Sequence, residues 1–305
     1  MMIIEDIDDF RSSDFDDLIR SAVNRNLVLV IGSGVSRNVT NKDGEHLPDW
    51  KGLLEEISNI LPNDSGCLNR MLSQENYLEA ADFLSHHCES ADIQKKICNA
   101  VYQNVPTNNI NSDWYKYITT LNPRIIITTN YDTILEDYFD ANSERDNFYL
   151  QYQVIHPENH ASDLVRLLRQ DRPVIIKMHG TCEKGEKVTG MVLSTTQYSR
   201  NISEHKKLYD ILRSLLLTKT FLFLGYSVGD PDFRIMLQET KYYDGGNPVA
   251  HHYMISSKMD EHHKNVLKEA YDIQAIEYSG GHELGYEILG KFAEEVQSRQ
   301  SESVM

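Results

Sequence analysis

Polar residues that could do chemistry follow two apolar stretches in the middle of the sequence. Asn130 and Asp132 come after RIIITT, and His179 comes directly after PVIIKM. An asparagine amide can hold a water or a ribose hydroxyl without charge, a carboxylate accepts hydrogen bonds, and a histidine can act as a general base near neutral pH. These types suit a site that binds a sugar-phosphate ligand and assists attack on it. Each also has a structural interpretation, because Asn130 could cap a helix and His179 could be a buried histidine that donates to a carbonyl.

Two glycine-containing turns follow the most apolar stretches of the chain. Leu27–Ile31 (LVLVI) precedes Gly32–Ser36 (GSGVS), and TFLFL precedes Gly225–Ser227 (GYS). Glycine lets the chain turn sharply and brings backbone N–H groups close to a ligand, and a helix that begins just after it favours a phosphate. One such turn is often only a turn. Four polar or glycine turns after four apolar stretches predict a shared ligand-binding cleft.

The rest of the pattern predicts the sheet that would position these turns. Apolar stretches alternate with amphipathic helical patterns, which is typical of an α/β fold with a doubly wound, mostly parallel, Rossmann-like sheet. In that architecture ligands lie beyond the carboxyl ends of the strands. Strands are predicted at residues 27–31, 124–129, 149–155, 173–178, 220–224, 250–256 and 273–278, with a hairpin at 185–193 around Gly190. Residues 45–121 keep helical spacing throughout, which predicts a helical lobe inserted into a single domain spanning residues 1–305.

Composition and cysteine spacing exclude several classes of function. A formal net charge of −16 over 305 residues argues against a general affinity for nucleic acid or anionic membranes. No segment approaches the roughly 20 apolar residues of a membrane span and no signal peptide is recognisable, so a cytoplasmic location is expected. Cys67, Cys88, Cys98 and Cys182 have no C-x-x-C spacing, so we expect neither a structural zinc site nor a disulfide framework. Adjacent histidines such as His251-His252 point apart on a strand, so no metal is expected there either.

The motifs, taken together, resemble those of the sirtuins. GSGVS is similar to the sirtuin GAG-x-S loop, TTNYD to the TQNID segment, and KMHG to the histidine–glycine motif. LPDW at residues 47–50 resembles the Pro-Asp-Phe segment that follows the glycine loop. GYSVGDPDF is closer still to bacterial sirtuin-like defence proteins. The motifs come in family order over residues 27–256.

The resemblance implies that the ligand is NAD. It places the pyrophosphate on the Gly32–Ser36 loop, the nicotinamide and its ribose at Asn130 and Asp132, and general-base work at His179. The implied catalytic residues are Asn130, Asp132 and His179, and the implied NAD-binding residues are Gly32, Ser33, Gly34, Ser36, Asp49, Gly225, Ser227 and Ser256.

Departures from the sirtuin pattern change the activity that we expect. Deacetylating sirtuins carry two C-x-x-C zinc pairs after the histidine–glycine motif, whereas Cys182 stands alone there. The strip that pairs with an acyl-lysine peptide is not recognisable either. NAD cleavage by water, as in the family's antiphage members, is therefore the expected chemistry, with nicotinamide and ADP-ribose as products. A non-catalytic NAD or ADP-ribose sensor stays open, and so, less favoured, does an NAD-dependent protein deacylase.

An NAD-depleting effector must be restrained until it is needed, and the sequence shows no sensor domain of its own. The resemblance implies a homo-oligomer that works with a separately encoded partner, such as a HerA-type ATPase or a short Argonaute. The helical lobe and the terminal helices are the expected contact surfaces. Direct binding to nucleic acid or membrane is not expected.

Overall fold

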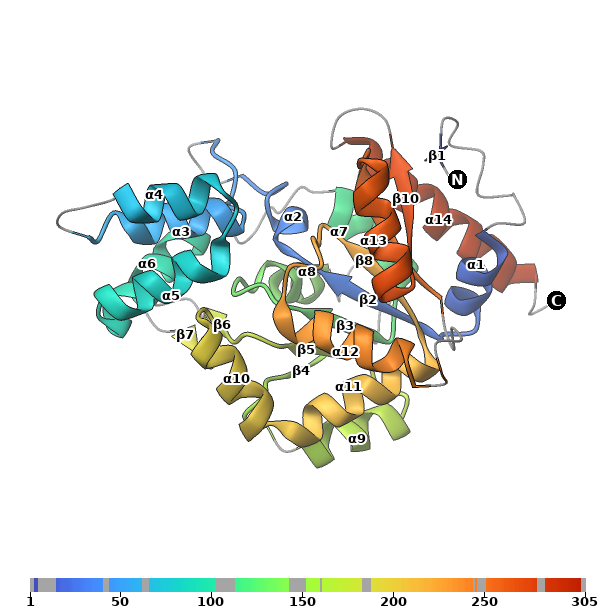
Figure 1. The fold of residues 1–305 in the computed structure, drawn as a ribbon. Coiled ribbons are helices and arrows are strands. Elements are labelled where there is room, and N and C mark those ends of the chain that lie inside the picture. The colour runs from blue at the N-terminus through green and yellow to red at the C-terminus, as the bar shows by residue number, and fades with distance from the viewer. Residues whose placement is uncertain are drawn as a thin grey trace.

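A parallel sheet of eight strands forms the centre of the molecule (Figure 1). The computed structural model describes residues 3–4, 15–40, 44–61, 66–102, 113–142, 152–159, 161–182, 188–243, 245, 251–278 and 283–302. The strand order is β1-β10-β9-β8-β2-β3-β5-β4, and each neighbouring pair runs parallel. The strands are β1 (Ile3–Ile4), β2 (Leu27–Ile31), β3 (Ile125–Thr128), β4 (Gln153–Ile155), β5 (Val174–Lys177), β8 (Thr220–Leu224), β9 (His252–Ser257) and β10 (Ile273–Tyr278). The predicted Rossmann-like α/β architecture is confirmed.

Helices cover both faces of this sheet. Strands β2, β3 and β5 are buried along their whole length, which explains why they are continuous apolar runs instead of alternating ones. One face packs against α1 (Asp16–Val23), α7 (Asp113–Leu121), α8 (Ile134–Asn142) and α14 (Glu283–Glu302). The other face packs against α9 (Ala161–Arg169), α11 (Lys206–Thr218), α12 (Pro231–Lys241) and α13 (Glu261–Tyr271). Successive residues of β2, such as Val28 and Leu29, point into these two separate cores.

A third apolar cluster holds the helices between β2 and β3 together. These are α3 (Trp50–Ser58), α4 (Gly66–Ser73), α5 (Tyr77–His87) and α6 (Ser90–Tyr102), which lie to the left of the sheet in Figure 1. Helix α7 closes the predicted helical segment, but its Trp114 and Tyr115 belong to the sheet core. The packing therefore separates α3–α6 from α7, which spacing alone did not distinguish. The division of the chain into one domain with an insertion stays a prediction.

Cys98 of α6 and Cys182 form a disulfide, with their Cα atoms 5.6 Å apart. The expectation that the cysteines would not pair was therefore wrong. The two residues are 84 positions apart in sequence, so their contact depends on how α6 packs and leaves no local spacing signal. Cys182 ends the short strand β6 (Thr181–Cys182), which pairs antiparallel with β7 (Val188–Thr189). The hairpin predicted at 185–193 around Gly190 was therefore misplaced, because the paired strands lie at 181–182 and 188–189 and Gly190 follows the second of them. The residues that connect the two strands fall outside the described ranges.

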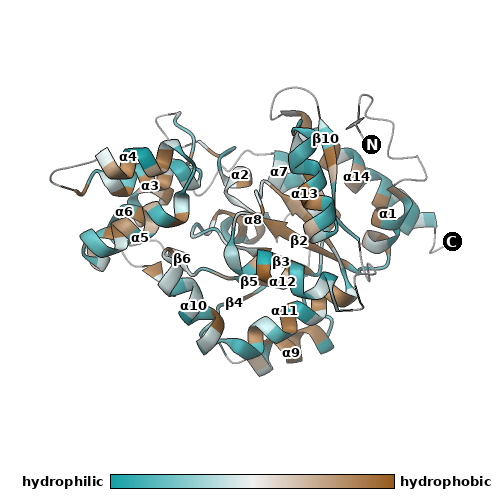
Figure 2. Cartoon of the chain, viewed as in Figure 1, coloured by the Kyte–Doolittle hydropathy of each residue, from teal (hydrophilic) through white to brown (hydrophobic). Residues whose placement is uncertain are grey.

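Hydropathy follows the same layers. Figure 2 shows hydrophobic residues concentrated in the central strands and on the helix faces turned toward them. Two further helices, α2 (Ser33–Ser36) and α10 (Thr195–Glu204), flank the carboxyl end of the sheet. Within the described ranges, none of the helices is long and apolar enough to span a bilayer.

Candidate active site

Four adjacent strands end at the same level of the sheet. Ile31 of β2 pairs with Thr128 of β3 and with Leu224 of β8, and Thr128 pairs in turn with Lys177 of β5. The strand order also reverses at the β8–β2 boundary, where open α/β sheets bind their ligands. The four turns that the sequence singled out therefore begin side by side. Asn130 and His179 lie two residues beyond the paired ends of neighbouring strands, which run about 4.8 Å apart.

The glycines of the first and fourth turns pack against each other. A Cβ on Gly32 would lie 2.4 Å from the Gly225 carbonyl oxygen, and one on Gly225, whose φ is +55°, would lie 2.4 Å from the Val35 nitrogen. The Gly32 N–H donates to the Leu224 carbonyl and the Gly34 N–H to the Gly225 carbonyl, at 3.0 and 2.9 Å. Two N–H groups of the predicted phosphate loop thus bond to the neighbouring turn. The role of this loop in binding pyrophosphate stays a prediction.

Ser36 joins the two polar residues that follow β3. The Asn130 Nδ2 donates to Ser36 Oγ at 3.0 Å, and Ser36 Oγ donates to Asp132 Oδ2 at 2.8 Å. The Ile134 N–H donates to the other oxygen of Asp132 at 3.1 Å. We call Ser36, Asn130 and Asp132 the asparagine cluster. Asn130 is half-buried and Asp132 is buried, so the amide is the more accessible group.

A buried lysine that sequence reasoning missed lies beneath the asparagine cluster. Lys177 is fully buried, and its Nζ donates to the backbone carbonyl of Asp132 and to Glu136 Oε1, the latter at 2.9 Å. Burial raises the pKa of Asp132, and the nearby Lys177 ammonium offsets only part of that rise. Lys177 is the first residue of KMHG, but its position at the end of a buried strand offered no sign of its partners.

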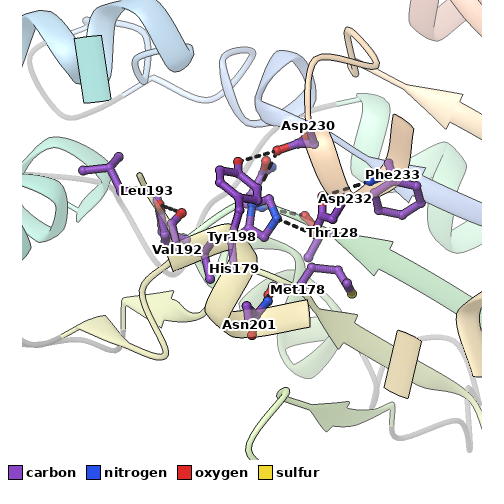
Figure 3. A network of polar contacts seen from close by, with 12 residues as sticks. Thr128, Met178, His179, Val192, Leu193, Tyr198, Asn201, Asp230, Asp232 and Phe233 are labelled. Atoms are coloured by element: carbon purple, nitrogen blue, oxygen red, sulfur yellow. Dashed lines mark hydrogen bonds and ion pairs between the residues drawn. The ribbon is translucent and has the colours of Figure 1, made fainter. Parts of the chain in front are cut away.

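His179 lies between two carboxylates on the other side of the edge (Figure 3). Its Nε2 is 3.1 Å from Asp232 Oδ2, and its Nδ1 is 3.5 Å from Asp230 Oδ1. The Tyr209 hydroxyl donates to Asp232 Oδ2 and the Tyr198 hydroxyl to Asp230 Oδ1, both at 2.9 Å. We call His179, Asp230 and Asp232 the histidine cluster. His179 and Asp232 are buried, and 19% of the Asp230 side chain is exposed.

The charges of the histidine cluster depend on one another. Burial lowers the pKa of His179, but the Asp232 and Asp230 carboxylates outweigh burial, so that the pKa is raised above its ordinary value. Burial raises the pKa of Asp232, but the His179 charge and its hydrogen bond leave that pKa lowered. The pKa of Asp230 is raised by burial and by the Asp232 charge, although His179 counteracts them. These shifts mean that Asp232 stabilises a positive charge on His179 whenever the ring takes up a proton.

The turn after β8 delivers both aspartates to His179. Val228 has φ +52° and is buried, a left-handed conformation that costs a branched residue about 1–2 kcal/mol. Pro231 then begins α12, with Asp230 before it and Asp232 in its first turn. The Asp-Pro-Asp segment of GYSVGDPDF was visible in the sequence, but its contact with His179 was not.

The residue after His179 must be a glycine. Gly180 has φ +90°, and a Cβ there would lie 2.2 Å from the Thr189 carbonyl oxygen.

The other predicted NAD-binding residues are more dispersed. Asp49 caps α3 by accepting from the Gly52 N–H at 2.9 Å, and its second oxygen is 2.6 Å from Arg37 Nη1. Ser227 is exposed on the turn after β8. Ser256 follows Ile255, the partner of Leu224, so it lies at the same edge. Ser33, half-buried, begins α2. Their proposed contacts with NAD stay predictions.

The histidine cluster has the residue types of a cation site, with candidate ligand atoms within 4.8 Å of one another. Both carboxylates already accept hydrogen bonds from tyrosines, and Asp232 also accepts one from the Phe233 N–H at 3.0 Å. The geometry therefore fits a hydrogen-bonded charge network. The expected absence of a metal stays a prediction.

The fold and the edge chemistry define a class of protein. A doubly wound parallel sheet with an asparagine after one strand and a histidine–glycine pair after its neighbour in the sheet is the arrangement that the resemblance to the sirtuins implied. The family model described as SIR2-like domain matches residues 124–276, half of the chain. The chain belongs to the SIR2-like domain family.

Curated relatives share this region at low identity. The chain is 24% identical over 221 residues to defense-associated sirtuin 2 of Bacillus subtilis, a match that covers 72% of this chain and 20% of the relative. It is also 24% identical to the NAD(+) hydrolase ThsA of Cytobacillus dafuensis, covering 75% of this chain and 42% of the relative. The ThsA of Enterococcus faecium matches 49% of this chain and 29% of its own length, again at 24% identity. The chain thus spans less than half the length of each relative.

Proposed function

We propose that this chain is an NAD⁺ glycohydrolase that releases nicotinamide and ADP-ribose, and that it is the NAD-depleting effector of a bacterial antiphage defence system. The observation that carries the proposal is the Thr128–Lys177 pairing, because Asn130 and His179 each follow these paired strand ends by two residues. The printed names of the relatives, an NAD(+) hydrolase and a defence-associated sirtuin, support both parts.

Hydrolysis of the bond between the ribose and nicotinamide requires an amide that orients the reactants and a general base, but no general acid. When the bond between C1′ of the ribose and the nicotinamide nitrogen breaks, its electron pair neutralises the positive ring, so nicotinamide leaves without a proton. Water forms the new C1′–O bond and must lose one proton. In the proposed mechanism Asn130 orients the water and the ribose, Asp132 holds the carboxamide, and His179 accepts the proton. A base in this role contributes about 10²–10⁴-fold.

Nicotinamide release and NAD binding test the proposal together. Wild type, His179→Ala and Asn130→Ala are incubated with NAD, and nicotinamide is followed while calorimetry measures binding. We expect both variants to lose about 10²–10⁴-fold in turnover and to keep their affinity for NAD within a few-fold. His86→Ala and Asn59→Ala remove exposed residues of α5 and of the end of α3, so they serve as matched controls.

Two outcomes would overturn the assignment. Near-full turnover in either variant would remove that residue from the mechanism. If the wild type binds NAD but releases no nicotinamide under any activating condition, the chain is a sensor. Because assembly can be part of activation, the assay is repeated with the separately encoded partner; a homo-oligomer that cleaves NAD only with its partner is the expected active form.

A further inference from the structure

His179 does not have two equivalent neighbours. Its Nε2 lies 3.1 Å from Asp232 Oδ2 and forms a hydrogen bond, whereas its Nδ1 lies 3.5 Å from Asp230 Oδ1, beyond hydrogen-bond range. Asp232 is fully buried, and the Asp230 side chain is 19% exposed. The ring is therefore held on its inner side and is freer on its outer side.

The inner carboxylate is itself fixed by several donors. Asp232 Oδ2 accepts from the Tyr209 hydroxyl at 2.9 Å, and its Oδ1 accepts from the Phe233 N–H at 3.0 Å. Asn201 donates to the Tyr209 hydroxyl and to the Met178 carbonyl, which ties the network to the residue before His179. A carboxylate held by this many donors fixes whichever ring hydrogen points at it.

We propose that Asp232 is a positioning residue for His179: its carboxylate holds the hydrogen on Nε2, so that Nδ1 accepts the proton of the attacking water. This inference rests on the proposed function. The water gives its oxygen to C1′ and one proton to Nδ1, the nicotinamide nitrogen takes the electron pair of the broken bond, and the charge on the resulting imidazolium is balanced by Asp232. Asp230 lies beside Nδ1 as the second negative charge.

The groups that set the charge of His179 come from three elements. Asp230 and Asp232 face it from the turn and first residues of α12, and Tyr198 of α10 contacts its ring edge-on, with centroids 4.9 Å apart. Tyr209 of α11 acts through Asp232. Among these groups, Asp232 is the one that hydrogen-bonds the ring, so its charge is the one to remove.

The ring tautomer of the wild-type protein is the first test, and it needs no turnover. Nitrogen-15 NMR of the histidine rings, with His179→Gln used to assign the signal, should show neutral His179 with its hydrogen on Nε2. A hydrogen on Nδ1 would overturn the proposal even if the protein cleaves NAD.

Asp232→Asn is the second test, because it keeps the shape and removes the charge. We expect kcat to fall roughly 10- to 100-fold, with the KM for NAD within about twofold. The limb of the pH–rate profile that reports neutral His179 should move to lower pH, because loss of the carboxylate lowers the pKa of the ring. Asp210→Asn makes the same charge change on the exposed side of α11 and should move neither quantity.

The outcomes separate the inference from the function on which it rests. If Asp232→Asn lowers kcat but leaves the pH limb and the NMR titration of His179 unchanged, Asp232 is merely structural and the proposal is wrong. If the wild type releases no nicotinamide while the NMR results are as expected, the proposed function fails and the positioning of the ring stands. Should Asp232→Asn not fold, Tyr209→Phe tests the same network, because it removes one donor from Asp232. The freed carboxylate should bind His179⁺ more strongly and raise the pKa of the ring in the NMR titration, and a fall in that pKa would contradict the proposal.

Discussion

His179 and His252 are equally buried, each with 3% of its surface exposed, but they lie at opposite edges of the sheet. His252 begins β9 at the amino edge, and its Nδ1 accepts from the Phe221 N–H at 3.3 Å. Burial, with a smaller contribution from His251, lowers the pKa of His252 to about 3. At the carboxyl edge, Asp232 and Asp230 outweigh the same burial and raise the pKa of His179.

The difference shows that burial by itself does not mark a functional histidine. A buried ring bonded to a backbone N–H stays neutral and fills the core, as His252 does. A buried ring that faces two carboxylates is a titrating group whose charge the surrounding network sets. One chain thus holds both kinds of buried histidine, and the partners of each ring distinguish them.

The largest expected effect concerns the disulfide that fastens the carboxyl edge to α6. In the chain-entropy model, closing a loop of 84 residues stabilises the fold by about 4.5 kcal/mol. The double variant Cys98→Ala/Cys182→Ala should have a free energy of unfolding lower by that order when urea unfolding is measured without reductant. Dithiothreitol should lower the free energy of unfolding of the wild type close to that of the variant. Cys67→Ala/Cys88→Ala, which removes the two free cysteines, is the control. Four titratable thiols in unfolded, unreduced wild type would contradict the disulfide.

The buried lysine of the carboxyl edge should have the next largest effect. Lys177→Met leaves Glu136, whose side chain is 14% exposed, without its cation, so the free energy of unfolding should fall by about 3–5 kcal/mol. Adding Glu136→Leu should recover much of that loss, because the unpaired charge is removed. Lys51→Met at an exposed pair should change stability by about 0.5 kcal/mol or less. A Lys177→Met effect as small as that of Lys51→Met would mean that the buried charge matters little.

The two histidines should give stability opposite dependences on pH. The lowered pKa of His252 means that its contribution is present above about 6.5 and is lost as pH falls toward 3, by about 3 kcal/mol at pH 4.5 relative to His252→Gln. The raised pKa of His179 means that its contribution is fully present below about 6.5 and is lost as pH rises through the raised value. Urea unfolding of wild type, His252→Gln and His179→Gln from pH 4.5 to 9 measures both. The same pH slope for both differences would break the comparison.

A variant with a smaller expected effect should show whether the asparagine cluster acts independently of the histidine cluster. Ser36→Ala removes the hydroxyl that joins Asn130 to Asp132, so stability should fall by about 1–3 kcal/mol and nicotinamide release should fall with it. The NMR titration of His179 should not move, because its charge depends on Asp230 and Asp232. Ser58→Ala, at an exposed hydroxyl that bonds to a local carbonyl, is the control. A shifted His179 titration in Ser36→Ala would show that the two clusters act as one.

The smallest expected effect is that of removing metal. Both carboxylates of the histidine cluster accept hydrogen bonds from tyrosines, and Asp232 also bonds to His179, so elemental analysis should find far less than one metal ion per chain. A chelator should leave stability and nicotinamide release unchanged. A stoichiometric ion lost in Asp230→Asn would refute this and give the cluster a different role.

Local patterns determined much of the fold and which polar residues stand at the carboxyl edge of the sheet. LVLVI, IIIT and VIIK predicted buried strands because residues buried on both faces of a parallel sheet are all apolar. The parallel alternation then implied that Asn130 and His179 would stand at one edge of the sheet, since carboxyl ends of parallel strands share that edge. The polar and glycine turns that follow these strands are likewise legible without coordinates.

What only the tertiary structure decided are the contacts between segments far apart in the chain. Cys98 meets Cys182 across 84 residues, and His179 meets Asp232 across 53. The charge of His179 likewise depends on a turn after a different strand, and Lys177 finds its partners in α8. No local periodicity encodes such pairs, because they depend on strand order and helix packing. The sequence therefore determined which residues stand at the edge of the sheet, and the packing of distant segments determined their charge.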